Sequence, residues 1–197
     1  MTARAYDIDN PARRTEFPAR RADGSAAALA RYRIDVIGST VEDVVASAGG
    51  WLFDRAMSGW DVNVFVTTPS DPRALQILGI KTGSPSPKRE SATKWPPTQA
   101  LAVGADIIDA DASVREIVTA TLERGLTEVT MWGDTRPAAL RHRANDVEHR
   151  LSSAARAFKA HALAATTLPP GPSAPTETFC SASRWFPPYE SDLLPIG

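Results

Sequence analysis

Residues 31–68 constrain the fold of this chain most strongly. A short apolar run at 32–37 meets the turn Gly38-Ser39-Thr40, and a helix-period segment and a second apolar run at 61–67 follow. This order predicts strand, tight turn, helix and strand, which is typical of a parallel α/β unit. Parallel sheets bind ligands at the carboxyl ends of their strands, so the pattern also predicts where a site should lie.

The rest of the chain extends this pattern. Apolar runs predict five strands, at 32–37, 61–67, 75–81, 100–108 and 126–132, although the run at 100–108 would also suit a helix. Helical spacing predicts one helix after Thr40, a second from Ala112 to Arg124 and a third from Pro137 to about Ala165. We therefore expect a Rossmann-like three-layer α/β domain with about five mostly parallel strands and a long C-terminal helix.

Composition divides the chain into three parts. Residues 1–30 combine arginine and proline with few large apolar side chains, which predicts a flexible arm. Residues 31–167 carry the Rossmann-like domain. Residues 168–197 form a Pro-rich tail whose Trp185, Phe186 and Tyr189 we expect to dock on this domain or on another subunit. Four prolines mark 83–98 as a long loop, either functional or disordered.

Charge and cysteine usage exclude several classes of protein. A net charge of −1 over 197 residues argues against wholesale binding to nucleic acid or membrane surfaces. No segment approaches a membrane-spanning length, and no secretory signal is visible at the N-terminus. The single cysteine, Cys180, excludes an internal disulfide and a multi-cysteine metal site, and we expect it to be an exposed thiol. A cytoplasmic location follows as the expectation.

A ligand site is predicted at the ends of the strands. Gly38, Ser39 and Thr40 stand where a helix N-terminus presents its amides to an anion. In a parallel sheet Asp71, Asp134 and Thr135 would reach the same edge. The alternative is structural, with Ser39 capping its helix in a box with Glu42 and Asp134 capping the helix at Pro137. The fingerprints of dinucleotide-binding and P-loop proteins are missing.

Two carboxylates could hold a metal. Asp109 and Asp111 follow an apolar pair and are spaced to bind Mg²⁺ through oxygen. With Ser113, this segment resembles the first motif of the haloacid-dehalogenase-like phosphatases. That resemblance implies Mg²⁺-dependent phosphoryl chemistry, but the family's later lysine and acidic pair have no counterpart. Capping of the next helix by Asp111 or Ser113 is the alternative.

The pair Gly49-Gly50 lies inside a predicted helix, where each glycine costs about 1 kcal/mol relative to alanine. Close packing within the domain would offset that cost. A flat surface formed with Trp51 and Trp60 for docking a subunit is the other interpretation, and it predicts self-association.

Three functional hypotheses follow. The first is a non-catalytic Rossmann-like protein that binds a protein partner or a small phosphorylated ligand, because no complete catalytic signature is present. The second is a Mg²⁺-dependent phosphoryl-transfer or hydrolytic enzyme that uses Asp109, Asp111 and Asp134. The third is a nucleic-acid-associated protein that uses the basic arm and the basic face of the third helix, although Asp146 and Glu148 interrupt that face.

Overall fold

A computed structural model describes residues 32–82, 98–134, 137, 144–168, 174–182 and 192–196. Along the chain its elements are β1 (Arg33–Gly38), α1 (Val41–Met57), β2 (Asp61–Val66), α2 (Arg73–Ile77), β3 (Lys81–Thr82), β4 (Ala100–Gly104), α3 (Ala105–Ala110), α4 (Ala112–Arg124), β5 (Glu128–Trp132), β6 (Asn145–Arg150), α5 (Ser153–Ala164), β7 (Thr176–Ser181) and β8 (Leu194–Pro195).

One sheet organises the described residues. Its strand order is β3-β2-β1-β4-β5-β7-β6-β8. The first five strands are mutually parallel, and β7, β6 and β8 continue the sheet with antiparallel pairing. The direction of winding reverses between β1 and β4, because β2 lies on one side of β1 and β4 on the other. In open α/β sheets this switch point is where ligands bind.

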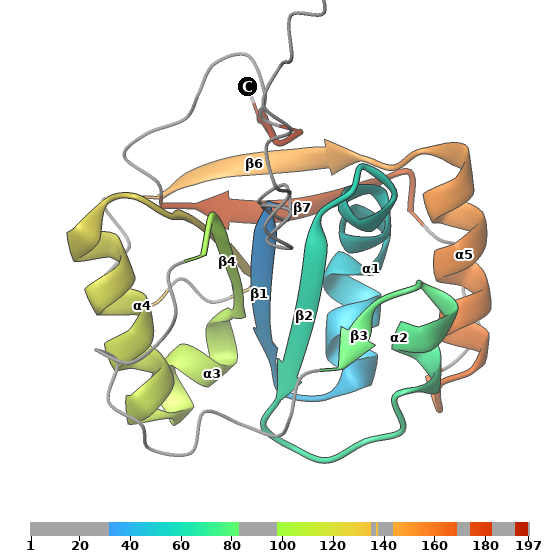
Figure 1. The fold of residues 1–197 in the computed structure, drawn as a ribbon, viewed down its shortest axis with the longest axis horizontal. Coiled ribbons are helices and arrows are strands. Elements are labelled where there is room, and N and C mark those ends of the chain that lie inside the picture. Colours follow the sequence, from blue (N-terminus) through green and yellow to red (C-terminus); the bar gives the residue numbers. More distant parts are fainter. Residues whose placement is uncertain are drawn as a thin grey trace, which may run out of the picture. The chain divides into compact units, whose positions relative to one another are not determined.

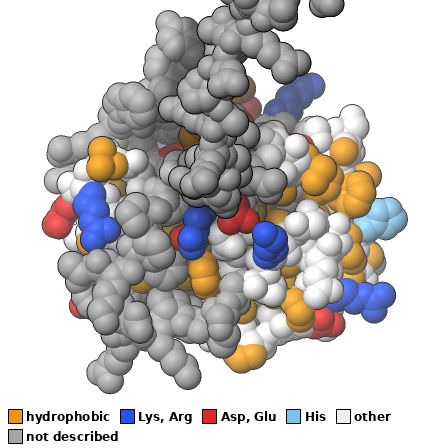
Figure 2. Space-filling model, in the orientation of Figure 1, with side chains coloured by type: hydrophobic (Ala, Val, Ile, Leu, Met, Phe, Trp, Pro, Cys, Tyr) orange, Lys and Arg blue, Asp and Glu red, His pale blue; other side chains and the backbone are white. Residues whose placement is uncertain are grey.

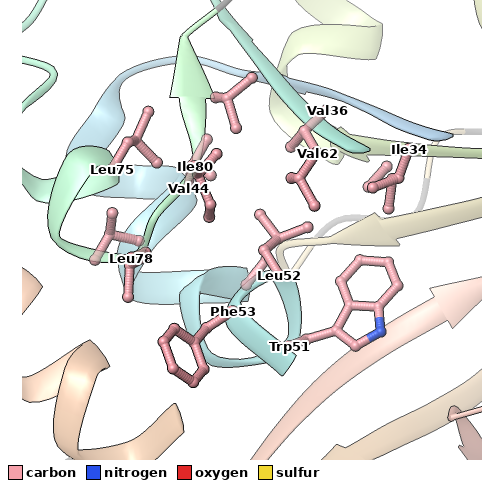
Figure 3. Close-up of a cluster of buried hydrophobic side chains, with 14 of the residues drawn as sticks. Ile34, Val36, Val44, Trp51, Leu52, Phe53, Val62, Leu75, Leu78 and Ile80 are labelled. Atoms are coloured by element: carbon pink, nitrogen blue, oxygen red, sulfur yellow. The ribbon is translucent and has the colours of Figure 1, made fainter. Parts of the chain in front are cut away.

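Helices cover both faces of the sheet. Figure 1 shows α3 and α4 on one side and α1, α2 and α5 on the other. Inward residues alternate along the strands accordingly, with Ile34 and Val36 in the larger core and Ile37 in the smaller one. In the larger core the fully buried Trp51 and Leu52 of α1 meet aliphatic side chains of the sheet and of α2 (Figure 3).

Several predicted elements are confirmed. The unit β1-α1-β2 matches the pattern at 32–67, and α4 has the predicted bounds. Helix α4 ends at Gly125, whose φ of 67° is the left-handed conformation that glycine adopts readily. One detail of α1 was wrong: its N-cap is Thr40, which accepts the amide of Asp43, so the capping pattern lies one residue beyond Ser39.

Two predicted elements are wrong. The segment 75–81 is not one strand, because α2 covers Arg73–Ile77 and β3 begins only at Lys81. The third helix, predicted from Pro137 to Ala165, is replaced over its described part by β6 and the shorter α5. Val147 and Leu151 are buried as predicted, but Val147 contributes from a strand and Leu151 from the residues that follow it.

The prediction of about five strands is corrected to eight within the residues that the structure describes, of which five are parallel. Strand β7 lies between β5 and β6, inside the segment assigned to the Pro-rich tail. Cys180 is half-buried on that strand, so it is not the exposed thiol expected.

Some predictions fall outside the described residues. These are the arm at 1–30, the loop at 83–97 and the aromatic residues Trp185, Phe186 and Tyr189. The proposed domain limits stay predictions. Among the helices described, none has both the length and the apolar character needed to cross a membrane.

Candidate functional site

Three neighbouring parallel strands end at glycine. Gly38 closes β1, Gly104 closes β4, and Gly133 follows β5 with a φ of 112°. A Cβ on Gly38 would stand 2.2 Å from Cγ2 of Val44, so the first turns of α1 pack directly on the end of β1. The absence of side chains at these positions lets α1 and Trp132 meet at the switch point of the sheet.

Asp43 is the carboxylate that this packing brings to the sheet edge. It lies in the first turn of α1 and is partly exposed. The indole Nε1 of the buried Trp132 lies 3.2 Å from each of its carboxylate oxygens, so the indole donates to that carboxylate. Ser47 donates to Oδ1 at 3.4 Å. Two donors from different elements therefore fix the carboxylate while leaving one side open to solvent.

A second carboxylate, Asp106, reaches the same place from α3. Its Oδ1 lies 2.8 Å from the position that a Cβ on Gly104 would occupy, and Trp132 Nε1 lies 3.5 Å from that position. Asp106 is exposed. Trp132 therefore connects the two carboxylates: its Nε1 donates to Asp43 and lies beside Gly104, as does Asp106.

A cavity of about 440 Å³ begins beside this group. It extends from the end of β5 to the antiparallel strands, and its lining residues are Met131, Trp132, Gly133, Asp134, Asp146, Thr178, Phe179, Cys180 and Ile196. The lining joins apolar and aromatic surface to carboxylates, which is the usual character of a small-molecule site. Trp132 belongs both to the cavity and to the Asp43 contact.

The structure separates the predicted ligand residues. Gly38, Ser39 and Thr40 are at the crevice, but the Ser39 carbonyl accepts the amide of Thr68 and Thr40 caps α1. Asp71 is exposed and accepts the amide of Arg73. Asp134 lines the cavity. Thr135 lies outside the described residues.

The predicted metal residues have other contacts. Asp111 caps α4 by accepting the amides of Ser113 and Val114, at 2.8 and 3.4 Å. Asp109 is exposed on α3. Within the described ranges, no group of three or more His, Cys, Asp or Glu side chains is placed to hold a metal ion. The Asp109–Asp111 magnesium site therefore stays a prediction.

Sequence reasoning missed Asp43, Asp106 and Trp132 as site residues. The capping pattern was assigned to Ser39 and Glu42, so Asp43 was not considered as a site residue. Asp106 was read as part of a strand at 100–108, whereas β4 ends at Gly104 and α3 begins at Ala105. The available signal was a glycine at the end of each apolar run with an acidic residue shortly after it: Asp106 follows Gly104 by two residues, and Asp43 follows Gly38 by five.

Charged side chains show no single patch on the visible face. Among the described residues in Figure 2, basic and acidic side chains are interspersed rather than gathered into one basic stripe. The exposed cations on α5 include Arg156, while Lys159 of the same helix is buried. The basic face predicted for the third helix is therefore only partly solvent-exposed.

Comparison with known proteins identifies the fold. No protein-family model and no curated protein matches the chain. A solved deacetylase–teicoplanin complex from teicoplanin biosynthesis matches 76% of this chain and 98% of its own, with a TM-score of 0.50 and 12% identity. Two further matches score lower. A zinc-inhibited form of teicoplanin deacetylase has a TM-score of 0.47 and 13% identity, and the match covers 67% of this chain and 82% of that one. The A40926 pseudoaglycone deacetylase has a TM-score of 0.45 and 16% identity, and the match covers 68% of this chain and 81% of that one.

This likeness corrects the first functional hypothesis. At 12% identity it shows the fold alone, and that fold is the one of a deacetylase, which is an enzyme. The interpretation as a non-catalytic binding protein, with its emphasis on protein–protein interaction, was wrong as the leading one. The hydrolytic alternative agrees better with the comparison.

Proposed function

We propose that this chain is a hydrolase of the deacetylase type whose reaction takes place at the carboxyl ends of β1, β4 and β5. The observation that carries the proposal is the partly exposed carboxylate of Asp43 at the switch point of a deacetylase-like fold, bound by Trp132, which itself lines the neighbouring cavity. In this view the strands β3-β2-β1-β4-β5 act as a Rossmann-like unit, with the site where such units bind ligands.

Asp43 is suited to the role of general base. A carboxylate with one open side can take a proton from water as the water oxygen attacks an acyl carbon. The bond from that carbon to nitrogen or oxygen then breaks, and the abstracted proton passes to the departing amine or alcohol. Asp106 supplies a second carboxylate at the same crevice for this transfer. The products are acetate and the deacetylated compound.

The roles proposed for Asp43 and Asp106 are those of a base and a proton carrier, and neither is proposed as a metal ligand. Magnesium stays a separate proposal, drawn from the sequence pattern of Asp109 and Asp111. Assays with chelator, with added Mg²⁺ and with added Zn²⁺ separate the two cases.

The test is acetate release from a panel of small N-acetyl and O-acetyl compounds. We expect turnover by the wild-type chain and a loss of about 100-fold or more in Asp43→Asn, the usual scale for a general base. Asp106→Asn should reduce the rate less. Glu116→Gln is the matched control, because Glu116 is an exposed carboxylate on α4 that belongs to none of the candidate sites.

Two results would contradict the proposal. One is the absence of acetate release in every metal condition. The other is full activity of Asp43→Asn with unchanged folding, which would move the reaction away from the crevice.

A further inference from the structure

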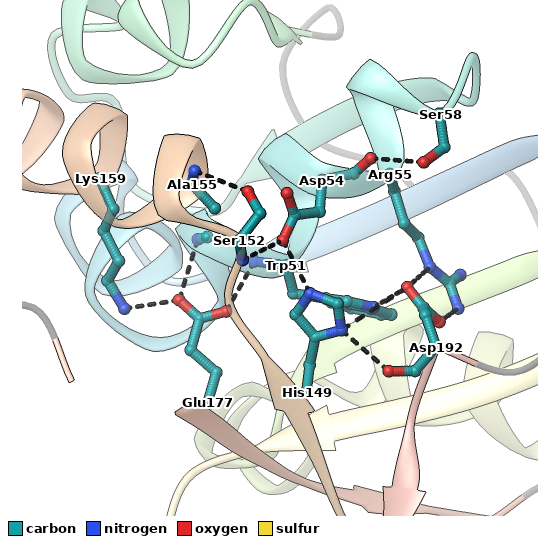
Figure 4. Close-up of polar contacts among 11 residues, drawn as sticks. Trp51, Asp54, Arg55, Ser58, His149, Ser152, Ala155, Lys159, Glu177 and Asp192 are labelled. Carbon is teal, nitrogen blue, oxygen red and sulfur yellow. Dashed lines mark hydrogen bonds and ion pairs between the residues drawn. The ribbon is translucent and has the colours of Figure 1, made fainter. Parts of the chain in front are cut away.

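Two charged side chains reach the backbone in the middle of α1. Lys159 of α5 donates from Nζ to the carbonyl oxygen of Ala46 at 2.6 Å and to Oε1 of Glu177 at 2.5 Å. The Glu177 carboxylate on β7 accepts the amides of Gly50 and Trp51, at 2.9 and 2.8 Å (Figure 4). Lys159 and Glu177 are only 5% and 4% exposed, so water does not compete for these bonds.

These contacts coincide with one step of the helix ladder. In a regular α-helix the amide of Gly50 donates to the carbonyl of Ala46, four residues earlier. Here the Ala46 carbonyl accepts from Lys159, and the Gly50 amide donates to Glu177. Because an amide has one proton and its bond to a carboxylate is charge-assisted, the carboxylate is the stronger competitor for that proton. The ion pair therefore stands between two backbone groups that would otherwise bind each other.

The glycine at position 50 leaves room for this insertion. A Cβ there would lie 3.1 Å from Oε1 of Glu177 and still closer to the side chain of Leu151. Glycine is also a weak helix former, so a ladder bond is given up here at less cost than elsewhere in α1. A side chain inserted into the ladder is one of the recognised causes of a bend in a helix.

The part of α1 that precedes this step carries Asp43. Its first amide, that of Val41, donates to the hydroxyl of Ser70 at 3.0 Å, and Ser70 lies in the loop before α2. Its last turn is held by Lys159 through Ala46. Groups from other elements therefore bind both ends of the segment that presents Asp43 to Trp132.

We propose that Lys159 and Glu177 are positioning residues for Asp43. Their ion pair takes the place of a backbone bond and divides α1 into a first segment, residues 41–49, and a second segment, residues 50–57. The first segment takes its direction from Ser70 and Lys159, and that direction sets where Asp43 meets Trp132. The importance of Asp43 rests on the proposed function, whereas the division of the helix can be tested without turnover.

The first experiment measures scalar couplings across hydrogen bonds by NMR in the isotope-labelled, full-length wild-type chain. We expect couplings from the amides of Gly50 and Trp51 to the carboxylate carbon of Glu177. The amide of Gly50 should show none to the carbonyl carbon of Ala46. A coupling between Gly50 and Ala46, or none to Glu177, would show an unbroken ladder and overturn the proposal.

The second experiment uses the double variant Lys159→Met/Glu177→Gln, which removes both charges and keeps side chains of similar size. The Ala46 carbonyl can then accept the Gly50 amide, so the ladder closes and the first segment changes direction. The Nε1 proton of Trp132 reports the contact with Asp43. We expect its NMR signal to move from the wild-type position toward that of Asp43→Ala, which lacks the acceptor.

Arg55→Lys is the matched control. It perturbs the second segment of α1 but leaves the Lys159–Glu177 pair in place, so the Trp132 signal should stay at the wild-type position. A wild-type Trp132 signal in the folded double variant would overturn the proposal and leave the ion pair a purely structural role. The coupling measurement uses the wild-type chain, so it decides the proposal even if the double variant does not fold.

Acetate release distinguishes this proposal from the proposed function. A displaced base should lower kcat of the double variant by about 10-fold and leave KM within about twofold of the wild type. An unchanged kcat would overturn the positioning role. Absence of turnover in the wild type would contradict the proposed hydrolysis, while the couplings and the Trp132 signal would still decide whether the ion pair sets the position of Asp43.

Discussion

The two ends of helix α1 use their polar side chains in opposite ways. At the first turn Asp43 is partly exposed and is bound by one indole and one serine hydroxyl. Near the other end Arg55 is 3% exposed and binds Asp192 and Glu128, with its guanidinium 4.4 and 4.3 Å from the ring centres of Trp51 and Trp60. The buried end, where Arg55 is paired with two carboxylates, is structural, and the partly exposed end is the one suited to a substrate.

The middle of α1 belongs with the buried end. The amides of Gly50 and Trp51 donate to the Glu177 carboxylate at 2.9 and 2.8 Å. Lys159 donates to the same carboxylate and to the carbonyl of Ala46, at 2.5 and 2.6 Å (Figure 4). A charged pair from α5 and β7 thus reaches the backbone of α1, which only a residue without a side chain at position 50 permits.

The largest expected effect is at Arg55. Arg55→Ala removes a buried charge and leaves Glu128 and Asp192 without it, which should lower the free energy of unfolding by about 4 kcal/mol. Urea unfolding measures the change. Arg156→Ala, on the exposed face of α5, should stay within about 0.5 kcal/mol of the wild type. Similar values for the two variants would show that the buried end is not the anchor we describe.

Glu177→Gln comes next. Lys159 would be left buried without a counter-charge, although the amide oxygen could still accept from the backbone of α1. We expect a loss of about 3 kcal/mol in unfolding free energy. In a double-mutant cycle, Lys159→Met should restore part of the loss, because it removes the unpaired charge. Additive losses in the cycle would argue against coupling between the two side chains.

Gly50→Ala tests the close approach directly. Its Cβ would lie 2.4 Å from Cδ2 of Leu151 and 3.1 Å from Oε1 of Glu177. We expect a loss of about 1–3 kcal/mol, since side chains must shift to make room. At Gly49 the nearest atom, Cδ1 of Leu78, is 3.3 Å away, so Gly49→Ala should be nearly neutral once helix propensity is counted. Equal effects of the two substitutions would contradict the close approach at position 50, because helix propensity alone would affect both positions alike.

Acid should weaken the buried end. Burial raises the pKa of Asp192, but the hydrogen bond and charge of Arg55 outweigh it and hold that pKa below its usual range. The stabilisation from Asp192 is therefore complete above its unfolded-state pKa, about 4, and is lost as the pH falls through the folded value.

The pKa of Glu128 is shifted the other way, because burial raises it despite the charge of Arg55. Glu128 therefore does not add to the loss of stability in acid.

The substitution Asp192→Asn removes the acid-sensitive carboxylate. The fall in unfolding free energy between about pH 5 and pH 2.5 should be smaller in this variant than in the wild type. Denaturant unfolding across this range measures it. If the free energy of unfolding fell equally in the variant and the wild type, other carboxylates would be responsible for the acid sensitivity.

The smallest stability effect is expected at the open end. Asp43→Asn keeps the shape of the side chain and an oxygen that can accept from Trp132, so unfolding should change by less than about 1 kcal/mol. Its acetate-release activity should nevertheless fall most. A large loss of stability in this variant would remove the contrast between the two ends of α1.

The sequence alone determined the elements whose signals are local. The run at 32–37, the helical spacing after Thr40 and the glycine at 125 predicted β1, α1 and the end of α4, because strand alternation, capping and left-handed glycine depend on neighbours within a few residues. The glycine pair in α1 also indicated close packing, which the contact of position 50 with Leu151 confirms.

The tertiary structure alone decided the rest. Strands β6 and β7 place His149 and Glu177 at inward positions, and such polar residues hide a strand from any hydrophobic pattern. Their burial is stabilised by Asp54, Lys159 and the backbone of α1, which lie far away in the chain. The candidate site has the same origin, because Asp43 and Trp132 are 89 positions apart and meet only when β1, β4 and β5 stand side by side.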